Sequence, residues 1–290
     1  MSARTAPGVA TRVRQRRRRA SIAWLVHIPL LALVVVTLAP LFVLFVNSVK
    51  TDLDIKADPL GLPASIHLDN FVNAWNTAGY TEAFRNSLIV TGATVAIVCL
   101  TGGMCAHAMA NLKLPGQNFV LVYLLLALTV PPLLYLVPLF VLWTKLHLIN
   151  TLPGLILIYS ALYLPFGIFL LRAYMINLPH EIEDAARIDG CSEWQTFQRV
   201  VLPLSWPAFA SVGLIVGVWS WNEFIFAITF LPSQDMQTVA VRYANFTGQW
   251  VSNYAYISSA GVIMILPAVI LFLLLQRRFV EGMTAGGLKV

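Results

Sequence analysis

Six long stretches of this chain contain no Asp, Glu, Lys or Arg, and this feature limits its possible folds more than any other. The shortest stretch is 23 residues long. The stretches are Ala20–Val49, Asn86–Leu112, Leu114–Thr144, Leu146–Leu171, Val200–Asn222 and Tyr243–Gln276. A helix needs about 20 apolar residues to cross a hydrocarbon core roughly 30 Å thick. The pattern therefore predicts an all-α polytopic membrane protein, and it excludes a barrel of short strands that alternate in polarity.

The composition agrees with this prediction, because only 11% of the residues are charged and 58% are hydrophobic. Soluble domains contain roughly 25% charged residues. We expect transmembrane helices at Ile22–Val46, Ser87–Met109, Phe119–Leu142, Gly154–Tyr174, Ala208–Leu231 and Tyr256–Leu275. The first is interpreted as a true span rather than a signal peptide, because its apolar part exceeds the core of about 7–15 residues that signal peptides have. Small residues in the second span would let helices approach closely.

Charge at the N-terminus predicts the orientation. Seven arginines precede the first span: Arg4, Arg12, Arg14, Arg16, Arg17, Arg18 and Arg19. A basic run can bind nucleic acid, but beside a membrane helix it favours a cytoplasmic N-terminus, and we expect no nucleic-acid partner. Six spans then place the C-terminus in the cytoplasm as well. The expected organisation is a basic N-terminus (1–21), a six-span region (22–275) with a cytoplasmic loop (177–207), and a C-terminal tail (276–290).

One cytoplasmic loop is unusually polar for this chain. It reads HEIEDAARIDGCSEWQTFQRVVLPLSWP and runs from His180 to Pro207. Its charged residues are Glu181, Glu183, Asp184, Arg187, Asp189, Glu193 and Arg199. Pro179 and the acids that follow suit the start of a helix. Ile182, Ala185 and Ala186 are spaced to share one helical face. Gly190 can adopt the left-handed conformation that ends a helix.

The second half of the loop predicts another short helix. Ser192 and Gln195 fit a capping box, Trp194, Phe197 and Val201 form an apolar stripe, and Pro203 is expected to end the helix. Such a pair could lie on the bilayer surface or dock into a protein cleft. The loop carries five acids and two arginines. Anionic lipid would repel a loop with this excess of negative charge, and this favours docking into a protein cleft.

The residues of this loop resemble a family signature. ABC importer permeases carry a cytoplasmic sequence E-A-A-x-x-D-G followed by L-P-x-x-x-P. The matching residues are Ala185, Ala186, Asp189, Gly190, Leu202, Pro203 and Pro207. Asp184 stands where the family has glutamate, with Glu183 just before it, which leaves open which acid contacts the partner. The segment Phe84–Thr91 resembles the start of the family's second span. Three further segments resemble the carbohydrate branch of the family, the maltose-type oligosaccharide importers: Asn177–Gly190, Ser220–Leu231 and Gln276–Lys289.

The resemblance implies a permease subunit that carries a sugar inward across a bacterial-type plasma membrane. Residues 181–190 would form the coupling helix, seated on a cytoplasmic ATPase dimer. Thr284, Gly286 and Gly287 would belong to a tail that reaches toward that dimer. The other implied partners are a second homologous permease, an extracytoplasmic sugar-binding protein and the lipid bilayer. The sequence contains no G-x-x-x-x-G-K-[ST] phosphate loop, so we expect ATP hydrolysis by a separate chain and no enzymatic activity here.

A short polar group near the outer end of the fifth span is a candidate for the translocation path. Glu223 is the one acid well inside an expected span, and ionisable groups in membranes are costly. With Trp221 and Asn222 it could meet sugar hydroxyls. The alternative, which we favour slightly, is a structural hydrogen bond between helices or to the partner permease.

Two other classes of protein are weighed against the importer. An ion-driven secondary transporter would want acids or histidines near the midplane and often repeated halves, and neither is found in the sequence. An intramembrane enzyme would want paired carboxylates, a nucleophile with its base or metal ligands within the spans. The three cysteines Cys99, Cys105 and Cys191 share no pair spacing and are expected to be free thiols. We expect no metal and no cofactor.

Overall fold

The chain folds as a bundle of helices in a computed structural model that describes residues 9–112, 114–249 and 253–287. The side chains of residues 9–26, 180, 249 and 277–287 lie outside this description. Within the described ranges the α-helices that belong to the apolar stretches are α1 (Val9–Ser48), α4 (Tyr80–Asn111), α5 (Gln117–Thr129), α6 (Leu136–Lys145), α7 (Leu152–Met175), α11 (Trp206–Asn222) and α14 (Tyr254–Gly287). The remaining elements are α2 (Asp52–Ala57), α3 (Asp69–Ala78), η1 (Pro132–Tyr135), α8 (His180–Ile188), α9 (Glu193–Thr196), η2 (Phe197–Val201), α10 (Leu202–Leu204), α12 (Ile225–Phe230), η3 (Gln234–Met236) and α13 (Val239–Gln249).

By length and composition, the described residues contain four candidate membrane spans, or up to six if each of two bent helix pairs counts as one span. Four helices are long and apolar enough to cross a membrane: His27–Ser48 of α1, α4, α7 and Tyr254–Gln276 of α14. Two further candidates are bent pairs, α5 with η1 and α6 at 94°, and Glu193–Leu204 with α11 at 77°. Of the second pair, we treat α11 as the span and Glu193–Leu204 as part of the polar loop. The helices α1 and α14 continue through the domain bounds expected at 21/22 and 275/276.

The prediction of a continuous third span at Phe119–Leu142 is wrong. Helix α5 ends at Thr129, Val130 is extended, and the chain turns through 94° before α6. Pro131 and Pro132 follow one another at the bend, and neither supplies the N–H that would continue a helix. With 13 residues, α5 is only about 20 Å long.

The core of the bundle is built where α4, α7, α11 and α14 pack together, and the largest helix–helix interface joins α4 to α7. Glycines allow close approach at two points. A side chain at Gly103 of α4 would place its Cβ 2.6 Å from Cζ of Phe209, and one at Gly167 of α7 would place it 2.7 Å from Cγ1 of Val98. Larger residues would force the helices apart at both points, so the small residues predicted to permit close packing do so at Gly103.

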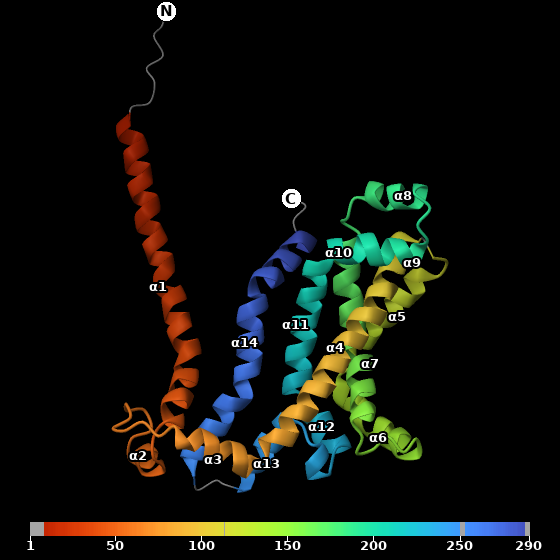
Figure 1. Cartoon of the computed structure of the whole chain (residues 1–290). Helices are drawn as coiled ribbons and strands as arrows, with labels where there is room; N and C mark the ends of the chain where they lie inside the picture. Colours follow the sequence, from red (N-terminus) through yellow and green to blue (C-terminus); the bar gives the residue numbers. More distant parts are fainter. Residues whose placement is uncertain (1–8, 113, 250–252, 288–290) are drawn as a thin grey trace, which may run out of the picture.

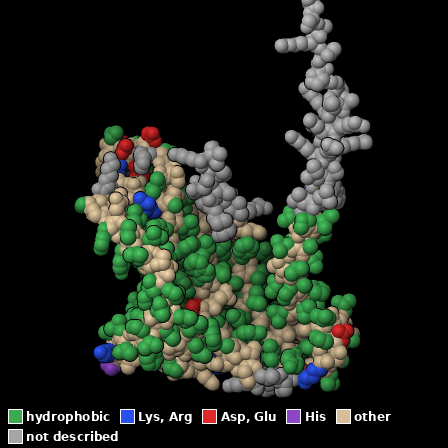
Figure 2. All heavy atoms as spheres, turned by 180° about the vertical axis from the view of Figure 1, so that it is seen from behind, with side chains coloured by type: hydrophobic (Ala, Val, Ile, Leu, Met, Phe, Trp, Pro, Cys, Tyr) green, Lys and Arg blue, Asp and Glu red, His purple; other side chains and the backbone are tan. Residues whose placement is uncertain are grey.

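Figure 1 shows that the N-terminal end of α1, the C-terminal end of α14 and the helices α8, α9 and α10 lie at one end of the bundle. The opposite end is covered by α2, α3, α6, α12 and α13. In the space-filling view (Figure 2), apolar side chains dominate the middle of the molecule and charged side chains gather mainly at the two ends. Large apolar side chains such as Val36 (70% exposed) and Phe119 (77% exposed) face outward, as expected of a surface that meets lipid.

Candidate functional site

The polar loop at one end of the bundle begins with α8 and a glycine turn. Gly190 has φ +82°, in the left-handed region. The Cys191 N–H donates to the Ala186 carbonyl (3.0 Å), and the Gly190 N–H donates to the Arg187 carbonyl (3.1 Å). These two bonds are those of a Schellman motif, which satisfies the last carbonyls of a helix. The predicted end of the first helix at Asp189-Gly190 is confirmed.

The second part of the loop begins with the predicted capping box. The Gln195 N–H donates to Ser192 Oγ (3.3 Å), and the Ser192 N–H donates to Gln195 Oε1 (2.9 Å). The prediction that Pro203 ends this helix is wrong. A π-helical turn, η2, precedes Pro203, and α10 continues to Leu204 before the chain bends at Ser205. Because the π turn changes the bonding register just before the proline, the chain stays helical through a residue that has no N–H.

The two faces of α8 differ sharply. Glu183 (2% exposed) and Ala186 (8% exposed) point inward, whereas Ile182 (41%), Ala185 and Ile188 (86%) are exposed. The predicted shared face of Ile182, Ala185 and Ala186 is therefore divided, because Ala186 lies one residue further round the helix and packs inward. The outward face is apolar around Ala185 and Ile188.

The signature residues beside this face are also placed. The side chain of Asp184 is 66% exposed, and Asp189 and Gly190 are exposed as well. Leu202 is half-buried and Pro203 exposed in α10. The outward apolar face of α8 is thus bordered by acids, while Glu183 belongs to the inner face.

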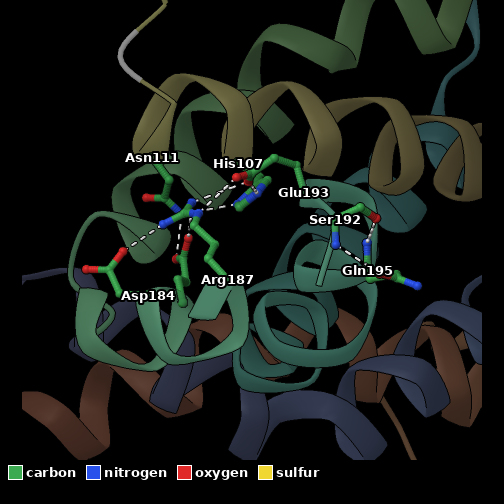
Figure 3. A network of polar contacts seen from close by, with 8 residues as sticks. His107, Asn111, Asp184, Arg187, Ser192, Glu193 and Gln195 are labelled. Atoms are coloured by element: carbon green, nitrogen blue, oxygen red, sulfur yellow. Dashed lines mark hydrogen bonds and ion pairs between the residues drawn. The ribbon is translucent and has the colours of Figure 1, made fainter. Parts of the chain in front are cut away.

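Arg187 is the centre of a network on the inner side of the loop (Figure 3). Its Nε donates to Glu193 Oε1 (2.8 Å), its Nη1 donates to Asp184 Oδ1 (2.9 Å), and its Nη2 lies 3.5 Å from Glu183 Oε2. The hydrogen bonds from Arg187 hold the pKa of Glu193 below its ordinary value, and those to Glu193 and Asp184 raise the pKa of Arg187. The guanidinium thereby joins α8 to α9.

The last turn of α4 contributes two residues that sequence reasoning missed. Asn111 Nδ2 donates to Glu183 Oε1 (2.6 Å) and lies 3.1 Å from His107 Nδ1. His107, 4% exposed, places its Nε2 3.9 Å from Glu193 Oε2. The available signal was the spacing of His107 and Asn111, which puts both on one helical face at the cytoplasmic end expected for that span.

Glu223 lies at a break in the expected fifth span, so the prediction of one helix through Ala208–Leu231 is wrong. Helix α11 ends at Asn222, Glu223 is extended, and α12 begins at Ile225. The carboxylate accepts from the N–H groups of Phe226 (2.9 Å) and Ala227 (3.0 Å) and from the Tyr159 hydroxyl (2.5 Å). Glu223 satisfies donors at the start of α12 and links that start to α7.

The two neighbours of Glu223 differ from each other. Trp221 is 5% exposed, its Nε1 donates to the Met264 carbonyl (3.0 Å), and its ring meets Phe84 at 5.5 Å. This placement in the core argues against a role for Trp221 in a translocation path. Asn222 is exposed and donates to the Val218 carbonyl of its own helix (2.8 Å).

An aromatic surface that the sequence analysis did not single out lies beside Asn222. Trp219 is 43% exposed, and its ring centroid lies 4.7 Å from that of Phe166 and 5.6 Å from that of Tyr163. Trp219 and Asn222 are three residues apart on α11, as Tyr163 and Phe166 are on α7, so each pair shares a helical face. Tyr163 and Phe166 are partly buried. The combination of the exposed Trp219 ring and the Asn222 amide suits contact with a sugar ring and its hydroxyls.

The tail residues Thr284, Gly286 and Gly287 belong to the last turns of α14, and their side chains lie outside the described residues. Arg4 and the side chains of the other N-terminal arginines also lie outside the described residues. Among the described residues, no group of three His, Cys, Asp or Glu side chains could hold a metal ion. Cys99, Cys105 and Cys191 are free thiols.

Comparison with known proteins gives consistent matches along the chain. Residues 98–285 match the family described as "Binding-protein-dependent transport system inner membrane component". The arabinooligosaccharides transport system permease protein AraQ of Halalkalibacterium halodurans is 33% identical over 279 residues, which cover 95% of this chain and 99% of that protein. The diacetylchitobiose uptake system permease protein NgcG of Streptomyces coelicolor is 32% identical, with 93% and 89% covered.

Solved structures share the fold. A bacterial ABC transporter involved in the import of the acidic polysaccharide alginate matches with a TM-score of 0.77 at 19% identity, covering 95% of this chain and all of that one. The alginate ABC transporter in complex with an alginate pentasaccharide-bound periplasmic protein matches with a TM-score of 0.66 at 16% identity, covering 90% of this chain and 95% of the other.

Proposed function

Because the chain belongs to the family of binding-protein-dependent transport system inner membrane components, we propose that it carries an oligosaccharide inward, driven by a separate ATPase through α8. It is a multi-pass inner-membrane subunit of a sugar ABC importer. The ion-driven alternative has no support from these relatives. The observation that carries the mechanism is the division of α8 into an inner face held by polar contacts and an outer face that is exposed and apolar.

The outer face of α8 is the proposed ATPase-docking surface, defined by Ile182, Ala185 and Ile188. Ile188 is 86% exposed, and burying it in a groove of another protein would recover its hydrophobic transfer free energy. Asp184 and Asp189 border the surface and offer carboxylates to a basic partner. Asp184 thus takes the position of the family's glutamate, and Glu183 has an internal role.

The end of the bundle that carries α8 is the proposed cytoplasmic end. The N-terminal end of α1 and the C-terminal end of α14 lie there too (Figure 1), and the N-terminal arginines favour the cytoplasm. The tail around Thr284, Gly286 and Gly287 would then lie on the ATPase side. The opposite end, with α12 and α13, would face an extracytoplasmic sugar-binding protein.

The proposed sugar-facing surface is Tyr163, Phe166, Trp219 and Asn222. A second homologous permease would close the path over this surface, since six spans are few to enclose an oligosaccharide alone. Stacking of a sugar ring needs an accessible indole, and Trp219 is 43% exposed whereas Trp221 is 5% exposed. The relatives carry arabinooligosaccharides and diacetylchitobiose by name, and this supports an oligosaccharide as the class of substrate.

The proposal is tested by purifying the tagged protein from its host in mild detergent and identifying the proteins that accompany it. One ATPase and one homologous permease are expected, and both should remain with the Gln198→Asp control, which changes an exposed residue of η2. Ile188→Asp should lose the ATPase and keep the second permease, because it places a charge in the docking surface. Recovery of the chain alone, or retention of the ATPase by Ile188→Asp, would contradict the proposed mechanism.

A further inference from the structure

The end of α4 is tied to the loop by side chains from both. Asn111, the last residue of α4, donates from Nδ2 to Glu183 Oε1 (2.6 Å) in α8. The same amide nitrogen lies 3.1 Å from His107 Nδ1. An amide nitrogen only donates, so Nδ1 of His107 accepts and the ring proton sits on Nε2. That nitrogen faces Glu193 Oε2 at 3.9 Å in α9.

Arg187 completes this connection from the loop side. It contacts Glu183 and Glu193, the same two acids that the end of α4 contacts. We call His107, Asn111, Glu183, Arg187 and Glu193 the α4 bracket. Glu183 is 2% exposed and His107 4% exposed, so the contacts of these two side chains with Asn111 are largely shielded from water, and polar interactions are stronger in such an environment. The side chains of Arg187 (32% exposed) and Glu193 (47% exposed) lie nearer the surface.

Helix α4 has no direct covalent connection to the loop. The chain joins α8 to α7 on one side and, through α9, η2 and α10, to α11 on the other. An apolar contact also exists, since the rings of His107 and Phe197 lie 5.5 Å apart. Apolar contacts are non-directional, whereas the hydrogen bond from Asn111 to a charged acceptor fixes both direction and distance.

Movement of α4 would affect the whole bundle. It packs against α7 and α11, with close approach at Gly103 against Phe209 and at Gly167 against Val98. Packed helices have little room to slide independently. A displacement of α8 that reaches α4 therefore also reaches the helices that carry the proposed sugar-facing surface.

We propose that Asn111 and His107 are positioning residues that fasten the coupling loop to α4, so that α8 and α4 move as one body when the ATPase closes. This inference rests on the proposed function, because it assigns α8 the role of receiving ATPase motion. It adds a transmission route that neither the loop signature nor the covalent chain supplies. Glu183 contacts both Asn111 and Arg187 within the bracket, and on this inner face of α8 it does not contact the ATPase.

The test follows α4 during the nucleotide cycle and uses MgATP with vanadate as the probe. The complete complex is placed in nanodiscs with Cys99, Cys105 and Cys191 replaced by alanine and Glu82→Cys introduced as a reporter at the outer end of α4. Glu82 is exposed. The rate of maleimide labelling is compared with and without trapped nucleotide, together with the amount of ATPase in the complex.

Two bracket variants and one control variant are compared with this parent. Asn111→Asp sets two carboxylates against each other and should weaken the tie about tenfold or more, which abolishes the nucleotide-dependent change in labelling. Asn111→Asp with Glu183→Gln exchanges donor and acceptor and should restore the change. Asn177→Leu is the control, because within the described part of the chain the Asn177 amide donates only to the Ala173 carbonyl near the end of α7. This variant should behave like the parent.

Each outcome decides the inference. A full labelling change in Asn111→Asp, with ATPase bound, overturns it, and so does failure of the reciprocal exchange to restore the change. A parent that shows no nucleotide-dependent labelling also overturns it. Sugar uptake by the same parent complex then separates the two hypotheses, since ATP-dependent uptake without movement of α4 leaves the proposed function standing and removes only the bracket.

Discussion

Tyr159 of α7 donates its hydroxyl hydrogen to Glu223 at the break between α11 and α12, with an oxygen–oxygen distance of 2.5 Å. The same carboxylate accepts two backbone N–H groups from the first turn of α12. A carboxylate within an expected span is costly unless it is hydrogen-bonded, and here three donors surround it. This geometry favours a structural role for Glu223 over direct sugar contact.

Glu223→Gln is expected to destabilise the protein. The amide keeps one oxygen, and its nitrogen can only donate, so it cannot replace the second oxygen that accepts from Ala227 and Tyr159. We expect a loss of about 1–3 kcal/mol, measured as a lower midpoint of thermal unfolding in detergent. Glu82→Gln at the exposed outer end of α4 is the control. Unchanged thermal stability with lost sugar uptake would instead place Glu223 in the path.

Trp219→Ala and Trp221→Ala are expected to distinguish a residue of the translocation path from a residue of the folded core. Removing the buried Trp221 indole should cost about 3–5 kcal/mol of folding free energy and lower the amount of protein in the membrane. Removing the Trp219 indole, which is 43% exposed, should lower the thermal midpoint less than Trp221→Ala does and reduce uptake of the transported sugar. Uptake at the parent level in Trp219→Ala would exclude the aromatic surface from the path.

Gly190→Val and Gly190→Asn form a pair that tests the turn after α8. No heavy atom lies within 4 Å of a Cβ added at Gly190, so only the backbone conformation is at issue. Asparagine is enriched at positive φ, whereas a β-branched residue there is an outlier. We expect the ATPase to stay bound in Gly190→Asn and to be lost in Gly190→Val, as judged by co-purification. Equal ATPase recovery from both would show that the turn does not position α8.

Arg187→Gln is expected to have a pH-dependent effect. In the parent, Arg187 lowers the pKa of Glu193. A carboxylate with a lowered folded-state pKa contributes stability above its unfolded pKa, and this contribution is lost as the pH falls through the lowered value. The thermal midpoints of parent and variant should therefore differ most near neutral pH and converge in acid. Arg199→Gln, an exposed change in the same loop, is the control. A difference independent of pH would contradict the ion-pair explanation.

The bracket and the break at Glu223 show where sequence reasoning stops. The capping box at Ser192 and the turn at Gly190 are local, because their partners lie within a few residues, and the sequence predicts both. Glu183 meets Asn111, which lies 72 residues earlier in the chain. Tyr159 meets Glu223 at a separation of 64 residues. No local spacing links such partners, because their contact depends on how the helices are arranged.

The sequence by itself determined that the chain is a helical membrane protein with six charge-free apolar stretches and a polar loop, since the length and charge of a stretch are properties of consecutive residues. The tertiary structure alone decided which face of α8 points outward and which tryptophan is exposed. It also decided where the third and fifth spans bend. The physical reason is that side chains project from a helix in all directions around its axis. Only packing against other helices determines which of these side chains are buried.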